Sequence, residues 1–182
     1  MPMDISNIEG LKWEKRWRAN NGGASTWVIP FPITRPANIV FHGKKHFDYG
    51  QFGIHIGQVD RLTFLGDSEK QVELTPVDCR EGSPTLHNKV VVYFNPSPLK
   101  YLIIPPGVAH AFKNLENVFT VNRPCILLDG KRKYFPRNDV IDWPLNNEKY
   151  PILKPNKIVV DSDYYLTQAT LRKKSETQIE RI

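Results

Sequence analysis

The sequence predicts an all-β sandwich or barrel, and three observations lead to this prediction. First, short runs rich in β-branched and aromatic residues follow one another between residues 25 and 129, separated by Gly, Pro, Asn and Asp. Second, several runs alternate apolar and polar residues, as half-buried antiparallel strands do. Third, the 15 prolines lie mostly between the runs, where a missing N–H breaks no ladder. The close spacing leaves no room for crossover helices, which argues against a parallel α/β fold.

The expected strands, in chain order, are STWVI, NIVFH, FGIHI, RLTFL, QVELTPV, KVVVYF, YLIIP, NVFTV and CILLD. Residues 4–18 are expected to form an amphipathic helix that ends at the Asn-Asn-Gly-Gly sequence following it. Residues 146–182 are expected to form an irregular strap and then a C-terminal helix. Because 182 residues is a typical length for one domain, we predict a single domain over residues 1–182, with its core at about residues 25–145.

The composition predicts the compartment. No apolar run approaches the roughly 18 residues that a membrane span needs, and the first residues contain no apolar signal core. Cys79 and Cys125 fit a reducing compartment, and they form no Cys-x-x-Cys pair. We therefore expect a cytoplasmic protein with no membrane association and no structural zinc site.

The net charge of +6 favours an anionic partner. The basic clusters GKRKYFPR and LRKK are short, and no stripe of alternating basic and aromatic residues is present. A small anion such as a nucleotide diphosphate is therefore expected to bind, and a nucleic acid is not.

Histidines are the best candidates for chemistry, because the chain has neither a Gly-x-Ser-x-Gly elbow nor a phosphate-binding glycine loop. His110 follows Pro-Pro-Gly inside the apolar sequence VAHAF, and is either a pocket-lining residue or a hydrogen-bonded core histidine. His55 is expected to face the barrel interior if Ile54 and Ile56 pack on the outside. A histidine paired with a carboxylate suits proton transfer near neutral pH. The remaining histidines lie beside loop signals and are expected to be exposed: His42, His46 and His87.

A bound catalytic metal is the less favoured reading of these histidines. Barrels that bind metal usually carry two histidines one residue apart, and the sequence GIHIGQVD offers only His55. Asp60 and the distant His110 are possible further ligands, at a spacing that is poor for such a site. We therefore predict no metal and no other cofactor, and we keep a metal-dependent enzyme as an alternative in which His55, His110 and a carboxylate hold the ion.

Three motifs in a fixed order resemble one enzyme family. VDCREGSPT is followed by YLIIPPGVAHAF and then by NDVIDWPL. This order is similar to that of the dTDP-4-dehydrorhamnose 3,5-epimerase family of cupin-fold enzymes, over roughly residues 53–145. The resemblance implies a cupin-type jelly-roll barrel without a metal, usually a homodimer, that binds a nucleotide-linked 4-keto sugar.

The resemblance also implies roles for individual residues. His55, in Gly-Ile-His, matches the family's catalytic base, and His110 matches its pocket-lining histidine. Arg61, which precedes a leucine at the start of the next strand, matches a substrate contact. The family's tyrosine acid and its dyad aspartate have no counterpart at their usual places. Tyr134 and Asp139, in KRKYFPRND, are the available substitutes, Tyr134 for substrate binding and Asp139 for catalysis.

These observations predict a nucleotide-sugar isomerase or epimerase involved in carbohydrate biosynthesis. It would abstract a proton next to the ketone of a 4-keto-6-deoxy sugar. Two alternatives remain open. The first is a non-catalytic cupin that binds a sugar nucleotide or supports a dimer, and the second is the metal-dependent cupin enzyme.

Overall fold

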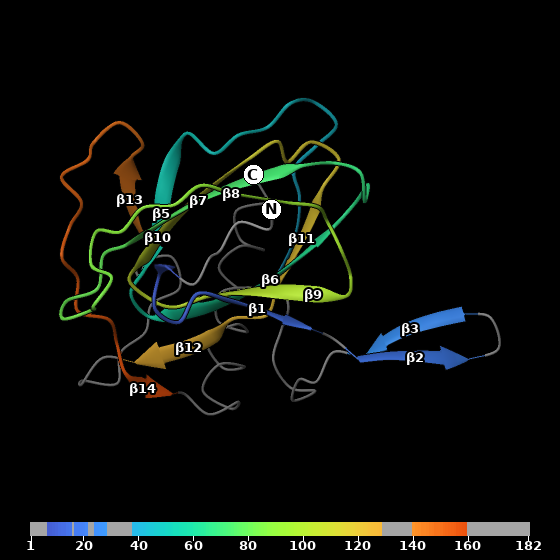
Figure 1. The fold of residues 1–182 in the computed structure, drawn as a ribbon, viewed down its shortest axis with the longest axis horizontal. Helices are drawn as coiled ribbons and strands as arrows, with labels where there is room; N and C mark the ends of the chain where they lie inside the picture. Colours follow the sequence, from blue (N-terminus) through green and yellow to red (C-terminus); the bar gives the residue numbers. More distant parts are fainter. Residues whose placement is uncertain (1–6, 16, 22–23, 29–37, 129–139, 160–182) are drawn as a thin grey trace, which may run out of the picture.

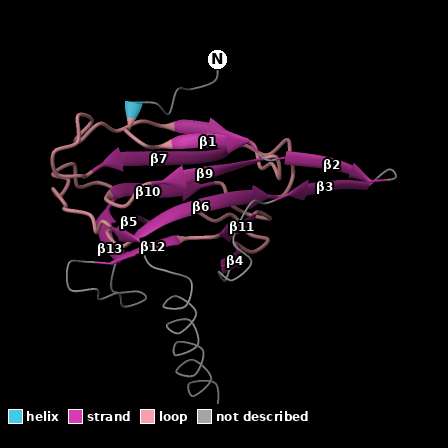
Figure 2. Cartoon of the chain, turned by 90° about the horizontal axis from the view of Figure 1, so that it is seen from below, coloured by secondary structure: helices cyan, strands magenta, loops and turns pink. Residues whose placement is uncertain are grey.

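The computed structural model describes residues 7–15, 17–21, 24–28, 38–128 and 140–159. Its strands form two antiparallel sheets that pack face to face, together with one separate hairpin (Figures 1 and 2). The hairpin joins β2 (Trp17–Asn21) to β3 (Ala24–Val28) and projects from the side of the sandwich.

The first sheet has the strand order β1-β9-β6-β11-β4, and β12 and β14 continue it from β6. Its strands are β1 (Lys12–Lys15), β4 (Asn38–Phe41), β6 (Gln58–Leu65), β9 (Lys100–Ile104), β11 (Phe119–Asn122), β12 (Cys125–Leu128) and β14 (Ile158–Val159). The second sheet has the order β13-β5-β10-β7-β8. Its strands are β5 (Gln51–His55), β7 (Val72–Asp78), β8 (Val92–Phe94), β10 (Val108–Lys113) and β13 (Val140–Pro144).

The prediction of an all-β fold is confirmed, and two facing antiparallel sheets fit a cupin-type jelly roll. Each expected run contains or overlaps a strand of the structure, from β3 to β12. Two strands that the sequence analysis did not assign, β10 and β13, complete the second sheet. Pro105-Pro106-Gly107 ends β9, and Gly107 has a φ of 81°, a turn conformation that suits glycine.

The helix predicted at residues 4–18 is wrong, and the described part of the chain contains no α-helix. Ile8 and Leu11 are buried as expected, but they close a tight turn in which the Leu11 N–H donates to the Ile8 carbonyl. Gly10 has a φ of 78° in this turn, and β1 then pairs with β9 in the register Trp13↔Leu102. Pairing with an open sheet edge therefore overrides the helical spacing of the apolar residues. The helix predicted near the C-terminus lies outside the described residues.

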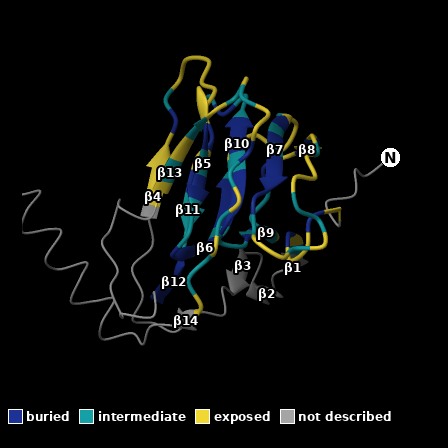
Figure 3. Cartoon of the chain, turned by 90° about the vertical axis from the view of Figure 1, so that its left-hand side faces the viewer, coloured by how far each residue is buried: buried dark blue, intermediate teal, exposed yellow. Residues whose placement is uncertain are grey.

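The main core lies between the sheets and takes buried side chains from both, including Leu62 and Phe64 on β6 and Leu74 on β7. A second cluster lies on the outer face of β5 and β10. Its members are Phe52, Ile54, Val77, Cys79, Ala109, Ala111 and Tyr150. Figure 3 shows that β7 and β10 are buried and that the edge strands β4 and β13 are exposed.

The second cluster determines which way the histidines point. Because side chains alternate along a strand, burial of Ile54 on the outer face turns His55 toward the space between the sheets. Burial of Ala109 and Ala111 does the same for His110 on β10. Residues 145–153 cover the outer cluster, so the segment predicted as a strap fixes the orientation of both rings.

Candidate functional site

A cavity of about 710 Å³ lies between the two sheets and contains the histidines of interest. Its wall is formed by β4, β6 and β11 of the first sheet and by β5, β10 and β13 of the second. Gly53 lies opposite His110 in the β5–β10 ladder, and it places no side chain in the cavity. The rings of His55 and His110 lie nearly parallel here, with centroids 6.0 Å apart and an angle of 25° between their planes.

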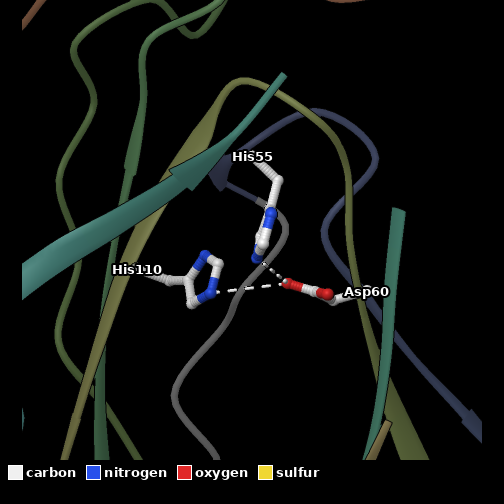
Figure 4. Close-up of side chains that lie close together, drawn as sticks. All are labelled: His55, Asp60 and His110. Carbon is white, nitrogen blue, oxygen red and sulfur yellow. Dashed lines mark ion pairs between the residues drawn. The ribbon is translucent and has the colours of Figure 1, made fainter. Parts of the chain in front are cut away.

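Asp60 lies to one side of the two rings and directs its carboxylate at both of them (Figure 4). Its Oδ2 is 3.4 Å from Nε2 of His110 and 3.7 Å from Nε2 of His55. Asp60 is only 2% exposed, so its charge is removed from bulk water. We call His55, Asp60 and His110 the imidazole–carboxylate cluster.

Two amides hold the other oxygen of this carboxylate. Asn122 donates from Nδ2 to Asp60 Oδ1 over 2.7 Å, and Gln58 donates to the same oxygen from Nε2. The Asn122 side-chain amide cannot flip by 180° without losing a hydrogen bond, because its oxygen accepts from the Arg61 N–H. Asp60 is therefore fixed with Oδ2 directed at the two rings.

Burial lowers the pKa of His110 below its usual value, and a charge on His55 would lower it further. The Asp60 carboxylate and the bond to the Val108 carbonyl oppose this effect. His110 is therefore expected to be neutral near pH 7. Nδ1 lies 3.1 Å from the Val108 carbonyl oxygen, which can only accept, so Nδ1 carries the proton. The lone pair of Nε2 is then directed toward Asp60.

A second polar group lines the same cavity at the β4–β11 side. His42 was predicted to be exposed, and this is wrong, since it is 6% exposed. Its Nδ1 donates to the Val118 carbonyl over 3.0 Å, and its Nε2 lies 3.3 Å from the Thr120 hydroxyl and 3.4 Å from the Tyr49 hydroxyl. Burial raises the pKa of Tyr49. The sequence held no signal for this group, because His42 and Thr120 are 78 residues apart.

The structure places the predicted site residues in different ways. His55 and His110 line the cavity together, as expected for both. Arg61 does not, because Gln58, Asp60 and Leu62 line the cavity and alternation along β6 directs Arg61 to the opposite face. The predicted contact between Arg61 and a ligand in this cavity is therefore not supported.

Asp139 and Tyr134, predicted as a catalytic residue and a substrate contact, lie outside the described residues. Within the described chain, Asp60 is the carboxylate beside His55. Sequence reasoning considered Asp60 only as a metal ligand and gave no role to Gln58 or Asn122. The alternation Gln58, Asp60, Leu62 was the available signal, since it places both polar residues on the face of a buried leucine.

A separate buried ion pair lies in the VDCREGSPT segment. Asp78 accepts from Arg80 Nη2 over 2.8 Å and from Arg80 Nε over 2.9 Å. The hydroxyls of Ser83 and Thr85 each donate to Asp78 Oδ2 over 2.6 Å. Asp78 and Arg80 therefore form an ion pair at a turn, away from the cavity.

No family model matches the chain, and no curated protein matches its sequence. Solved structures do share its fold. A dTDP sugar isomerase from Desulfovibrio desulfuricans matches with a TM-score of 0.56 and 14% identity, over 81% of this chain and 92% of its own. A dTDP-4-dehydrorhamnose 3,5-epimerase from Bacillus anthracis, with TDP and PPi bound, matches at 0.58 and 13%, over 91% and 96%.

A further match is a histidine-to-asparagine variant of a 3,4-ketoisomerase from Thermoanaerobacterium thermosaccharolyticum in complex with TDP-4-keto-6-deoxyglucose. It has a TM-score of 0.51 and 16% identity, and covers 91% of this chain and 97% of that one. The chain has the fold of the dTDP-sugar epimerases and ketoisomerases. The resemblance found in the three motifs is thereby confirmed at the level of the fold. No helix in the described part of the chain is long and apolar enough to cross a membrane.

Proposed function

We propose that the protein is a nucleotide-sugar isomerase or epimerase that removes a proton next to the ketone of a 4-keto-6-deoxy sugar. The observation that carries the proposal is the pair of imidazoles on one buried carboxylate, inside a cavity of a fold shared with enzymes of this class. Fold alone does not determine activity, so the weight rests on the cluster.

His55 is the proposed base. Its side chain is 20% exposed, so a substrate in the cavity can reach the ring, whereas Asp60 behind it is almost fully buried. When His55 takes a proton from carbon, the negative charge of Asp60 stabilises the imidazolium that forms. His110 offers a second nitrogen to the same carboxylate, so a proton can be shared within the cluster.

The cluster favours movement of the ketone to the neighbouring carbon. This reaction takes a proton from C3 and returns one to C4, while the proton of the C3 hydroxyl passes to the C4 oxygen, and a proton-carrying cluster on one face of the sugar can serve these transfers. Inversion at carbon requires a proton donor on the other face of the sugar. Tyr49, whose hydroxyl lies near His42 in the same cavity, is the proposed donor for that reaction.

The sugar, rather than the diphosphate, is the part of the ligand that suits the cavity. In the part of the chain that the structure describes, the wall contains Asp60 and Asp142 and no lysine or arginine. Hydrogen bonds from cationic donors bind a diphosphate most strongly. We therefore propose that its main contacts come from outside this wall.

The test is solvent deuterium exchange. The protein is incubated in D₂O with TDP-4-keto-6-deoxyglucose, and NMR follows the protons at C3 and C5. Exchange is expected at the carbon beside the ketone, and His55→Ala should slow it by about 10²- to 10⁴-fold, the usual contribution of a general base. Loss of the C3 proton together with deuterium at C4 would support ketone movement, whereas deuterium at C3, or at C3 and C5, with the ketone still at C4 would support epimerisation.

His46→Ala is the matched control, because this imidazole is exposed and lies outside the cavity wall. It should exchange at the rate of the unaltered protein. Binding of the sugar nucleotide without exchange would overturn the enzymatic proposal in favour of a non-catalytic binding protein. Neither binding nor exchange would mean that the ligand class is wrong.

A further inference from the structure

Gly53 leaves a patch of bare backbone on the cavity wall. It lies on β5 opposite His110 of β10 on one side and opposite Asp142 of β13 on the other. Along β5 itself, Gln51 and His55 are the next residues on the same face, because side chains alternate along a strand. All of these residues line the cavity, so Gly53 is surrounded by polar side chains. We call this position the Gly53 hollow.

Nothing in the described structure requires glycine at this position. No described heavy atom lies within 4 Å of a Cβ built on Gly53, its chain neighbours aside, and its φ lies outside the positive region that favours glycine. The β5–β13 register runs without interruption from His55↔Val140 to Gln51↔Pro144, so the strand has no bulge here. Glycine inside a strand often marks a bulge, a bend or a close approach to the backbone. Because the strand is regular and the space is empty, we infer the close approach of a ligand.

Asp142 brings a carboxylate to the edge of this hollow. The residue is exposed, and within the described chain its carboxylate accepts no hydrogen bond and forms no ion pair. Gln51 adds an amide, which both donates and accepts. A ring that carries hydroxyl groups suits these neighbours, because each hydroxyl can donate to the carboxylate and accept from the amide. A phosphate does not suit them, because the charge of Asp142 repels it.

The hollow also lies within reach of the proposed base. Two residues along a strand are separated by about 6.6 Å, so His55 stands at one edge of a ring that lies over Gly53. Asp142 stands at another edge, because β13 pairs with β5 at Gly53 itself. One ring can therefore present a carbon to His55 and its hydroxyl groups to Asp142 at the same time.

We propose that the sugar ring of the ligand lies against the backbone of Gly53 and donates hydrogen bonds from its hydroxyl groups to Asp142. Gly53 and Asp142 are then specificity-determining residues, the first by leaving room for the ring and the second by selecting rings with hydroxyl donors. The inference rests on the proposed function, because it takes a sugar nucleotide as the ligand. It places the diphosphate away from Asp142.

The first test is calorimetric titration with TDP-6-deoxyglucose and with TDP. TDP-6-deoxyglucose carries the sugar without a ketone, so it cannot react, and TDP lacks the sugar. Gly53→Ala and Gly53→Val place methyl groups where the ring would lie. Overpacking of this kind corresponds to a loss of about 10- to 100-fold in affinity. Both variants should bind TDP-6-deoxyglucose more weakly by this factor and should bind TDP as the unaltered protein does.

Gly50→Ala is the matched control. Gly50 is exposed and lies outside the cavity wall, and it has the same empty Cβ position and a φ outside the positive region. Its affinity for both ligands should equal that of the unaltered protein. Unfolding in urea distinguishes a filled hollow from a misfolded protein. Since a Cβ at Gly53 contacts no described atom, the midpoint of unfolding should not fall in Gly53→Ala.

The second test replaces the carboxylate. Asp142→Ala should weaken the binding of TDP-6-deoxyglucose by about 10-fold, the effect of losing one hydrogen bond to a charged group, and should not weaken the binding of TDP. Asp142→Asn keeps an acceptor oxygen and should recover part of the affinity. Glu148→Ala removes the same charge from an exposed residue outside the cavity wall, and should leave the affinity for both ligands unchanged.

The outcomes separate this inference from the proposed activity. Loss of affinity for TDP-6-deoxyglucose alone, in Gly53→Val and in Asp142→Ala, supports the inference whether or not the unaltered protein exchanges deuterium. Unchanged affinity for TDP-6-deoxyglucose in these variants, or an equal loss for both ligands, would overturn it and leave the exchange test of the proposed function standing. If the unaltered protein binds neither ligand, the inference and the proposed ligand class are both wrong.

Discussion

Asp60 and Asp78 are both buried, at 2% and 0% exposure, yet their surroundings differ in kind. Asp78 has a permanent counter-ion, the bidentate guanidinium of Arg80, and two hydroxyl donors besides. Asp60 has two neutral amides and two imidazoles whose charge depends on pH. A buried carboxylate with a fixed counter-ion has its acceptor positions filled and is structural, whereas one beside imidazole rings can take part in proton exchange.

The pKa of Asp78 reflects this saturation. Burial by itself would raise the pKa, but the hydrogen bonds from Arg80, Ser83 and Thr85 outweigh it and lower the pKa to about 2. Asp78 therefore stays charged throughout the working range of pH. The four predictions that follow test whether the two aspartates are as different as their partners indicate.

The largest expected effect is on proton transfer in Asp60→Asn. The amide keeps the shape of the carboxylate, but it cannot stabilise an imidazolium on His55, so deuterium exchange should fall by about 10²- to 10⁴-fold. The new NH₂ group can donate to the ring nitrogens, and the free energy of unfolding should change by less than about 1 kcal/mol. Exchange at the normal rate in this variant would remove Asp60 from the proposed mechanism.

Asp78→Ala is expected to lower the stability of the protein and to leave deuterium exchange unchanged. This change leaves the Arg80 guanidinium, whose side chain is 15% exposed, with the exposed Glu9 carboxylate, 3.9 Å away, in place of its bidentate partner. The free energy of unfolding in urea should fall by about 3–5 kcal/mol, while exchange per folded molecule is unchanged. Glu148→Ala, which removes an exposed partner of Lys89, is the control and should cost no more than about 1 kcal/mol. Equal effects of the two variants would show that the Asp78 pair is not structural.

A smaller effect on the free energy of unfolding is expected when the pH is lowered. An aspartate has a pKa near 3.9 in an unfolded chain, and Asp78 has a pKa of about 2 when folded. The folded state therefore binds fewer protons between these values, so the contribution of Asp78 is fully present above about pH 4 and is lost as the pH falls toward about 2. The free energy of unfolding of Asp78→Ala should depend less steeply on pH over this interval. Parallel curves for the two proteins would contradict the lowered pKa.

The smallest effect is expected in Ser83→Ala. It removes one hydroxyl donor to Asp78 Oδ2, but Arg80 and Thr85 still bind the same oxygen. The loss of one hydrogen bond to a charged group should lower the free energy of unfolding by about 1.5 kcal/mol. A loss as large as that of Asp78→Ala would mean that the hydroxyl, rather than the guanidinium, stabilises the charge.

The sequence by itself determined the fold class, because strand-forming runs, alternation, and proline and glycine at the breaks are local signals. The same alternation indicated that His55 faces the interior, since Ile54 was expected to pack outside. The helix at residues 4–18 failed because its apolar spacing, carried by Ile8 and Leu11, is also compatible with a turn. The segment forms a turn and a strand rather than a helix because β1 pairs with the open edge of β9.

Only the tertiary structure decided the partners within the cavity. Asp60 lies five residues after His55, but His110 and Asn122 lie 50 and 62 residues beyond Asp60 along the chain. They meet because β10 pairs with β5 and β11 pairs with β6, in registers set by long-range packing. A shift of one residue in either ladder would direct these side chains to the opposite face. Local signals specify which residues form strands, whereas the register between distant strands specifies which side chains share a site.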